Sequence, residues 1–140
     1  MKSNENHIFL DTNVLIGAYS GYAKDKKCLD YLFSLSGKRL YISTLSIAQI
    51  VSVFHKRKTS RQIKDIVLKI IAKFNLIGFH ENDITKSLNY ENEDMEDNIQ
   101  YVISQKFKCF WFITNNRKDY VYFSNIEVLK PQDVRDIAQS

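Results

Sequence analysis

Asp11 is the residue whose surroundings in the sequence point most directly to chemistry. It follows the apolar run Ile8-Phe9-Leu10 and precedes the polar pair Thr12-Asn13. A short apolar run of this kind is typical of a buried parallel strand, and the residues after it resemble the start of a helix. Open α/β sheets bind ligands at the carboxyl ends of such strands. Asp11 is therefore a candidate metal ligand, nucleophile or helix cap.

More acids are found next to a second apolar run at residues 110–113. Asp94 and Asp97 open the helical pattern before this run, and Asp119 lies in the polar loop after it. Carboxylates from separate strand ends repel one another unless a proton, water or cation intervenes. Hard cations take oxygen ligands, and such a metal can orient a water and stabilise charge on a phosphodiester. We therefore expect a site for Mg²⁺ or Mn²⁺.

Each acid also has a purely structural interpretation. Asp11 could cap a helix that begins at Thr12, and Asp94 could cap a helix with Asp97 three residues later. Asp119 could simply belong to its polar loop. Taken one by one these roles suffice, but they leave the gathering of acids at strand ends unexplained.

The elements that would position the acids alternate between strand and helix. Apolar runs predict strands near residues 8–10, 40–42, 77–79, 110–113 and 126–129. Helical spacing of apolar residues covers 28–35, 47–54, 63–74 and 95–103, and the stripe over 63–74 predicts a core or dimer face. This alternation predicts a three-layer α/β/α sandwich around a mainly parallel sheet of four to five strands. We expect one domain over residues 1–140.

Composition narrows the class of protein further. With 44% hydrophobic and 13% aromatic residues the chain is globular, and its formal net charge of +4 is modest. No membrane span or secretory signal is apparent, and Cys28 and Cys109 form neither a disulfide framework nor a metal-binding spacing. We expect a cytoplasmic protein with reduced thiols and no membrane association.

Three segments, in this order, resemble the PIN-domain ribonucleases, in particular the toxins of bacterial toxin–antitoxin systems. The matching segments are residues 9–16, 41–50 and 94–120, and together they span nearly the whole chain. The resemblance implies a PIN-like fold and a Mg²⁺- or Mn²⁺-dependent endoribonuclease that cleaves RNA phosphodiester bonds. It also implies a homodimer and a cognate antitoxin that blocks the pocket.

Carried over position by position, the resemblance makes Asp11, Asp97 and Asp119 the catalytic, metal-binding acids. The expected supporting residues of the pocket are Asn13, Ser43, Gln49, Asp94, Thr114 and Asn116. Basic clusters can track RNA phosphates, although they can equally be solvated helix ends. The expected RNA-binding residues are Lys56, Arg57, Arg117 and Lys118.

Gln49 departs from the family, which usually carries a glutamate at that position. An amide keeps an oxygen but removes a negative charge, so we expect weaker metal affinity, especially for a second cation. Catalysis with one metal, catalysis that demands more metal, and RNA binding without cleavage all remain open. Glu93 or Glu96 could supply the missing charge. The alternative function is a catalytically weakened PIN-like module that binds RNA or protein.

Two other classes of phosphoryl-transfer protein also place an acid after the first strand. Haloacid-dehalogenase-like enzymes typically carry a second aspartate two positions after the first, where this chain has Asn13. They and phosphoacceptor receiver domains also use late residues that are not evident here. Both classes are disfavoured.

Overall fold

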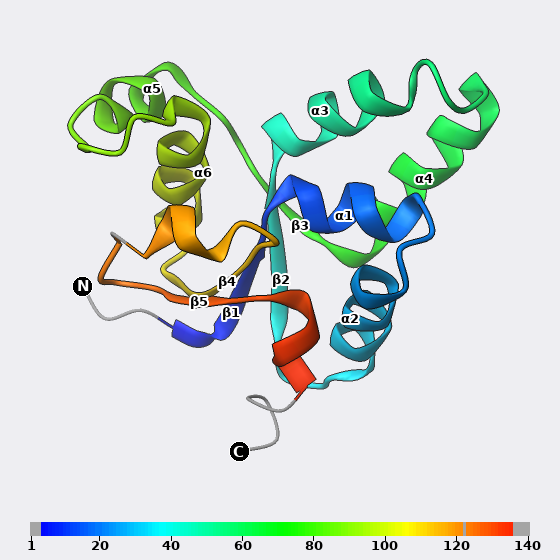
Figure 1. The fold of residues 1–140 in the computed structure, drawn as a ribbon, viewed down its shortest axis with the longest axis horizontal. Helices are drawn as coiled ribbons and strands as arrows, with labels where there is room; N and C mark the ends of the chain where they lie inside the picture. Colours follow the sequence, from blue (N-terminus) through cyan, green and yellow to red (C-terminus); the bar gives the residue numbers. More distant parts are fainter. Residues whose placement is uncertain (1–3, 122, 136–140) are drawn as a thin grey trace.

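Five parallel strands form the centre of the computed structural model, which describes residues 4–121 and 123–135 (Figure 1). The strand order is β3-β2-β1-β4-β5, and all four neighbouring pairs are parallel. The predicted parallel sheet is confirmed. The strands are β1 (Asn4–Leu10), β2 (Arg39–Ser43), β3 (Asn75–Ile77), β4 (Cys109–Ile113) and β5 (Glu127–Leu129).

Helices cover both faces of this sheet, which confirms the α/β/α layers (Figure 1). One face carries α1 (Thr12–Tyr19), α2 (Ala23–Ser34), α3 (Thr44–Phe54) and α4 (Ser60–Lys73). The other carries α5 (Glu81–Ser87) and α6 (Met95–Gln105), and two short 3-10 helices follow, η1 (Arg117–Tyr120) and η2 (Pro131–Asp133). None of the helices in the described part of the chain is long and apolar enough to cross a membrane.

Each central strand contributes side chains to the core on both sides of the sheet, because successive side chains point to opposite faces. Ile8 and Leu10 pack among residues of α1 to α4, whereas Phe9 packs with Phe112 on the α6 side. The strand is buried on both sides, so its apolar residues run without alternation. Its carboxyl end brings Asp11 to the edge where α1 begins.

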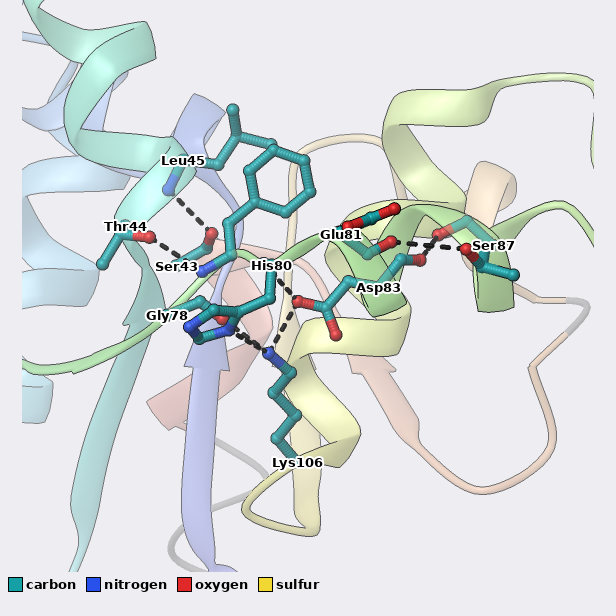
Figure 2. A network of polar contacts seen from close by, with 11 residues as sticks. Ser43, Thr44, Leu45, Gly78, His80, Glu81, Asp83, Ser87 and Lys106 are labelled. Atoms are coloured by element: carbon teal, nitrogen blue, oxygen red, sulfur yellow. Dashed lines mark hydrogen bonds and ion pairs between the residues drawn. The ribbon is translucent and has the colours of Figure 1, made fainter.

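Helix α5 is absent from the predicted elements, and contacts from a distant helix hold it in place. Its buried Asp83 accepts hydrogen bonds from the backbone N–H of His80 (2.7 Å) and from Lys106 at the end of α6 (2.6 Å) (Figure 2). Lys106 also donates to the carbonyl of Gly78 (2.6 Å). These hydrogen bonds connect the segment after β3 to α6, the helix whose first turn contains Asp97.

Candidate functional site

A polar pocket of about 580 Å³ opens at the carboxyl end of β1, between the start of α1, the middle of α3 and the start of α6. This is where an open parallel sheet is expected to bind a ligand. Its apolar and hydroxyl lining comes from α1 and α3. The acids and amides that line it are Asp11, Asn13, Gln49, Asp94, Glu96, Asp97 and Asn116.

Asp11 both caps α1 and lines the pocket. Its Oδ1 accepts from the backbone N–H of Thr12 (2.8 Å), and its Oδ2 accepts from Thr114 Oγ1 (2.8 Å) and Asn13 Nδ2 (3.2 Å). Burial raises the pKa of Asp11 to about 6, against the lowering effect of the hydrogen bonds from Thr114 and Thr12. The negative charge of Glu96 raises the same pKa further. The carboxylate is therefore firmly oriented but short of positive charge.

Asp97 is likewise short of positive charge, and one of its carboxylate oxygens has no hydrogen-bond partner. Its side chain is only 8% exposed, and its Oδ2 is buried without any hydrogen bond. Burial raises the pKa of Asp97 to about 7; a hydrogen bond from Tyr120 opposes this shift, while the charges of Asp94 and Asp11 add to it. Asp94 caps α6 by accepting from the backbone N–H of Asp97 (3.1 Å), so its predicted capping role is confirmed.

The hydroxyl of Tyr120 lies between the two buried acids. It is 3.2 Å from Asp11 Oδ2 and 2.9 Å from Asp97 Oδ1. Burial and the two neighbouring carboxylates raise the pKa of Tyr120, so it stays protonated. Because a phenol has one hydrogen to donate, it satisfies one carboxylate at a time, and both contacts are satisfied only when one acid carries a proton.

Gln49 links α1 to α6 across the mouth of the pocket. Its Oε1 accepts from Thr12 Oγ1 (2.6 Å), and its Nε2 donates to Glu96 Oε1 (2.6 Å). Behind it, Gln100 Nε2 donates to Thr12 Oγ1 (3.0 Å), and Ser46 Oγ is 2.6 Å from the same hydroxyl. Position 49 is thus a part of the pocket.

The structure brings most of the predicted supporting residues to this pocket. Asn13, Gln49, Asp94 and Asn116 line it, and Thr114 contacts Asp11. Ser43 is outside the described lining: its hydroxyl accepts from the backbone N–H of Leu45 and caps α3 (Figure 2).

Asp119 is half-buried in η1 and is likewise outside the residues that line the pocket. Its backbone carbonyl accepts from Asn92 Nδ2 (3.2 Å), and its charge contributes to the raised pKa of Asp97. In residues 4–121 and 123–135, no three His, Cys, Asp or Glu side chains form a group that could hold a metal ion. The three predicted ligands therefore do not converge as expected, and Asp11 and Asp97 are the pair that meets.

The donor chemistry of this pair nevertheless fits a hard divalent cation. Asp11 and Asp97 present carboxylate oxygens, and the unpartnered Oδ2 of Asp97 is a buried acceptor that a cation would satisfy. The pocket is large enough for bound water to complete the coordination of such an ion. The fit rests on two buried acids with further oxygen donors at the rim.

Among the contributors to the site that were not assigned from the sequence are Ser46, Gln100 and Tyr120. Gln100 follows Asp97 by three residues on α6, a spacing that places two side chains on one helical face. That spacing is a signal that could have identified Gln100. Ser46 and Tyr120 carry no comparable signal, since their directions depend on how α3 and η1 pack.

The predicted RNA-binding cations lie on two segments, one just after α3 and the other in η1. Lys56 and Arg57 are exposed just beyond the end of α3, the helix whose residues 48–53 border the pocket. Lys118 is exposed in η1, and Arg117 beside it donates from Nε to the carbonyl of Val128 (3.0 Å). Their role in binding RNA stays a prediction.

Comparison with known proteins agrees with this architecture. No family model matches the chain. Ribonuclease VapC1 from Aquifex aeolicus (strain VF5) is 21% identical over 146 residues, covering 93% of this chain and 94% of that protein.

Two solved structures share the fold over 89% of this chain, each with a TM-score of 0.68. A toxin–antitoxin complex from Klebsiella pneumoniae is 23% identical and is covered over 97% of its chain. VapBC2 from Rickettsia felis, bound to a DNA fragment from its promoter, is 16% identical and is covered over 98%. The resemblance to the PIN-domain family of toxin ribonucleases, predicted from the motifs of this sequence, is thereby confirmed.

Proposed function

We propose that this protein is an endoribonuclease that cleaves RNA phosphodiester bonds with a divalent cation, Mg²⁺ or Mn²⁺, and that it is the toxin of a toxin–antitoxin pair. The meeting of Asp11 and Asp97 at one polar pocket carries the proposal. Similarity to ribonuclease VapC1 over 93% of the chain supports the same activity.

In this proposal Asp11 and Asp97 hold the cation. A bound divalent cation orients a water, lowers its pKa and stabilises negative charge on the phosphodiester. Thr114 and the backbone N–H of Thr12 fix the direction of the Asp11 carboxylate, while Asp94 fixes the first turn of α6 and hence Asp97. Asp119 acts on Asp97 through its charge.

The substrate is RNA held by its backbone phosphates. Lys56 and Arg57 lie beyond one side of the pocket, and Arg117 and Lys118 follow the pocket residue Asn116 on another. Cations in these positions offset the repulsion between a polyanion and the acidic pocket. They position the strand without selecting its sequence.

The proposed partners are a cognate antitoxin and a second copy of this chain. Toxin–antitoxin complexes are among the solved structures that share the fold, which supports the first. The second is checked by light scattering of the purified protein, for which a mass twice that of the 16.4 kDa chain is expected.

Cleavage of labelled single-stranded RNA in a Mn²⁺ titration tests the proposal. We expect wild-type protein to cut the RNA, EDTA to stop the reaction, and Asp11→Asn to abolish cleavage while the protein stays folded. Asp30→Asn is the matched control, because Asp30 is an exposed acid on α2 outside the pocket. It is expected to cut at the wild-type rate.

The alternative of an RNA- or protein-binding module predicts a different result. Wild-type protein that binds RNA but leaves it intact across the Mn²⁺ range would overturn the nuclease proposal. Equal cleavage by wild-type protein and Asp11→Asn would point to a contaminating nuclease and would also count against this site.

A further inference from the structure

Another depression, of about 630 Å³, is formed chiefly by residues 88–94, the loop between α5 and α6. We call it the Tyr90 depression. Glu93 lines it, and the next residue, Asp94, lines the polar pocket, so the two sites adjoin along the chain. The residues described as lining the Tyr90 depression are Asn89, Tyr90, Glu91, Asn92, Glu93 and Phe123.

Tyr90 is the aromatic side chain that a ligand can reach in this depression. Its ring is steeply inclined to those of Tyr101 and Phe123, at centroid distances of 5.4 and 5.3 Å, and those two rings stack on each other at 3.8 Å. Tyr101 and Phe123 are buried, whereas Tyr90 is 39% exposed. Unpaired bases of RNA commonly stack on aromatic side chains of this kind, which the protein holds but leaves accessible.

Hydrogen bonds hold the loop against the elements of the polar pocket. Asn92 Nδ2 donates to the carbonyl of Asp119 in η1 (3.2 Å), and Asn92 Oδ1 accepts from the backbone N–H of Asp94 (3.2 Å). The carbonyl of Asn92 accepts from Nδ2 of the buried Asn98 on α6 (2.9 Å). The depression is therefore held next to the first turn of α6, which contains Asp97.

The polar groups of the Tyr90 depression suit a base better than a phosphate. Glu91 and Glu93 are exposed acids, and among the described lining residues there is no lysine or arginine. Carboxylates repel a phosphate, but they accept hydrogen bonds from the amino group of cytosine. Uracil has a carbonyl oxygen in the place of that amino group, and an ionised carboxylate, which only accepts, cannot pair with it.

We propose that the Tyr90 depression binds a base of the RNA substrate next to the phosphate that approaches the acids, and that it prefers a base with an exocyclic amino group. Tyr90 supplies the stacking surface, and Glu91 and Glu93 supply the hydrogen-bond acceptors. This inference rests on the proposed function, since it assigns a base preference to the same RNA substrate.

Binding of labelled oligocytidine and oligouridine in EDTA, where the proposed nuclease is inactive, tests the inference by fluorescence anisotropy. Wild-type protein should bind oligocytidine at least about fivefold more tightly. Tyr90→Ala should raise the Kd for both RNAs by about tenfold, because one base loses its stacking partner. Tyr90→Phe should restore most of the affinity, since it restores the ring. Tyr22→Ala is the matched control, because Tyr22 is exposed and outside the described lining of both sites.

The ratio of the two Kd values tests the glutamates. Glu91→Gln combined with Glu93→Gln should bring the ratio close to one, because a glutamine can donate to uracil as well as accept from cytosine. The loss of two negative charges should tighten the binding of both RNAs alike, so it cancels in the ratio. Glu81→Gln on α5 is the control and should leave the ratio unchanged, since Glu81 is exposed and outside the described lining of both sites.

The possible failures are distinguishable. Equal affinity of wild-type protein for the two RNAs, or a ratio unchanged by the paired glutamine substitutions, would overturn the base preference. An affinity unchanged in Tyr90→Ala would overturn the stacking role and leave the depression to another ligand, such as a protein segment. If Tyr90→Ala fails to fold, the paired glutamine variant still decides, because both glutamates are exposed.

These binding measurements contain no cleavage step, so they separate this inference from the proposed nuclease. Wild-type protein that shows the preference but cuts no RNA with Mn²⁺ would overturn the nuclease and leave the base subsite. Wild-type protein that cuts RNA but binds oligocytidine and oligouridine equally would overturn the subsite and leave the nuclease.

Discussion

At the scale of residues, two buried acids share a single hydroxyl group. This arrangement affects the stability of the protein when no cation is bound. Tyr120 contacts Asp11 and Asp97 from one phenol oxygen. Asp11 also accepts hydrogen bonds from Thr12, Thr114 and Asn13, whereas Asp97 Oδ2 has no hydrogen-bond partner. Negative charge kept in such a place costs stability but leaves the site ready for a cation.

Removal of the Tyr120 hydroxyl should therefore destabilise the protein in EDTA. Tyr120→Phe leaves its two acids with one donor fewer, and we expect the free energy of unfolding to fall by about 1–3 kcal/mol. Urea denaturation at pH 7 measures the change. Tyr22→Phe is the control, because Tyr22 is 63% exposed. Unchanged stability in Tyr120→Phe would mean that the hydroxyl does not stabilise the acids.

The raised pKa of Asp97 predicts how stability depends on pH. Folding raises this pKa from 3.8 to about 7, so the folded protein holds a proton that the unfolded chain has already released. The resulting stabilisation is complete below about pH 4 and is lost as the pH rises through about 7. Asp97→Asn removes this titration, and in EDTA it should be more stable than wild-type protein at pH 8.

Urea midpoints between pH 5 and pH 8 measure this effect. The decline in stability with pH should be shallower in Asp97→Asn, although Asp11, with its pKa of about 6, preserves part of it. Asp30→Asn should follow the wild-type curve. A decline as steep in Asp97→Asn as in wild-type protein would contradict the assignment of the titration to Asp97.

At the scale of elements, the sequence predicts those helices and strands that have a local pattern of apolar residues. The strands near residues 8–10 and 110–113 are recognisable because burial on both faces demands unbroken apolar runs. Strand β1 nevertheless begins at Asn4, which pairs with Cys109 of β4. Helix α5 has little apolar pattern, and Ile84 within it is exposed, so the contact between Asp83 and Lys106 that holds it is invisible locally.

The candidate site also has a part that the sequence predicts and a part that it does not. Open parallel sheets bind ligands at the carboxyl ends of their strands, and this rule predicts that Asp11 and Asp97 approach one another. Asp119 is outside the lining of the pocket and Tyr120 contacts both acids, and these two placements depend on the path of η1, which no periodicity encodes. The contact between Gln49 and Glu96 joins residues 47 positions apart and emerges only from packing.

Gly17 in α1 allows close packing against Asp25 of α2, and Asp25 in turn holds Asn115 in the loop after β4. A Cβ at this position would collide with Asp25 Oδ2 on α2, and Asp25 is buried and accepts from Asn115 Nδ2. Alanine usually stabilises a helix interior relative to glycine by about 1 kcal/mol. Here we expect Gly17→Ala to destabilise the protein by about 1–3 kcal/mol, as overpacked cores do.

A double-mutant cycle checks that the clash is the cause. The cost of Gly17→Ala, measured by urea denaturation, should be much smaller in an Asp25→Ala background than in wild-type protein. Equal costs in the two backgrounds would exclude Asp25 as the obstacle. Asp25→Ala alone measures the loss of the hydrogen bond to Asn115.

On the scale of the whole molecule, charge is unevenly distributed. The formal net charge is +4, yet five of the sixteen acids lie in residues 91–97, next to the pocket. The rest of the chain is correspondingly more basic, with exposed Lys56 and Arg57 beyond the end of α3. A polyanionic strand would therefore be held by the cationic surroundings while one phosphate approaches the acids.

This distribution predicts how RNA affinity depends on salt. Each lysine or arginine that neutralises a phosphate of a single strand contributes about 0.7 to the slope of log affinity against log salt. Measured in the Asp11→Asn background, where the RNA should stay intact, the separate changes Lys56→Ala, Arg57→Ala and Lys118→Ala should each weaken binding and flatten that slope by about this amount.

The loss should be similar for RNAs of different sequence, because phosphate contacts carry no base information. Lys86→Ala on α5 is the control: Lys86 is exposed and cationic but lies on a helix away from the pocket, so it should change neither affinity nor slope. If Lys86→Ala lowered the slope as much as the other three, RNA would be held by overall charge. A slope unchanged by Lys56→Ala and Arg57→Ala would instead remove the end of α3 from the RNA path and leave η1 to hold the strand.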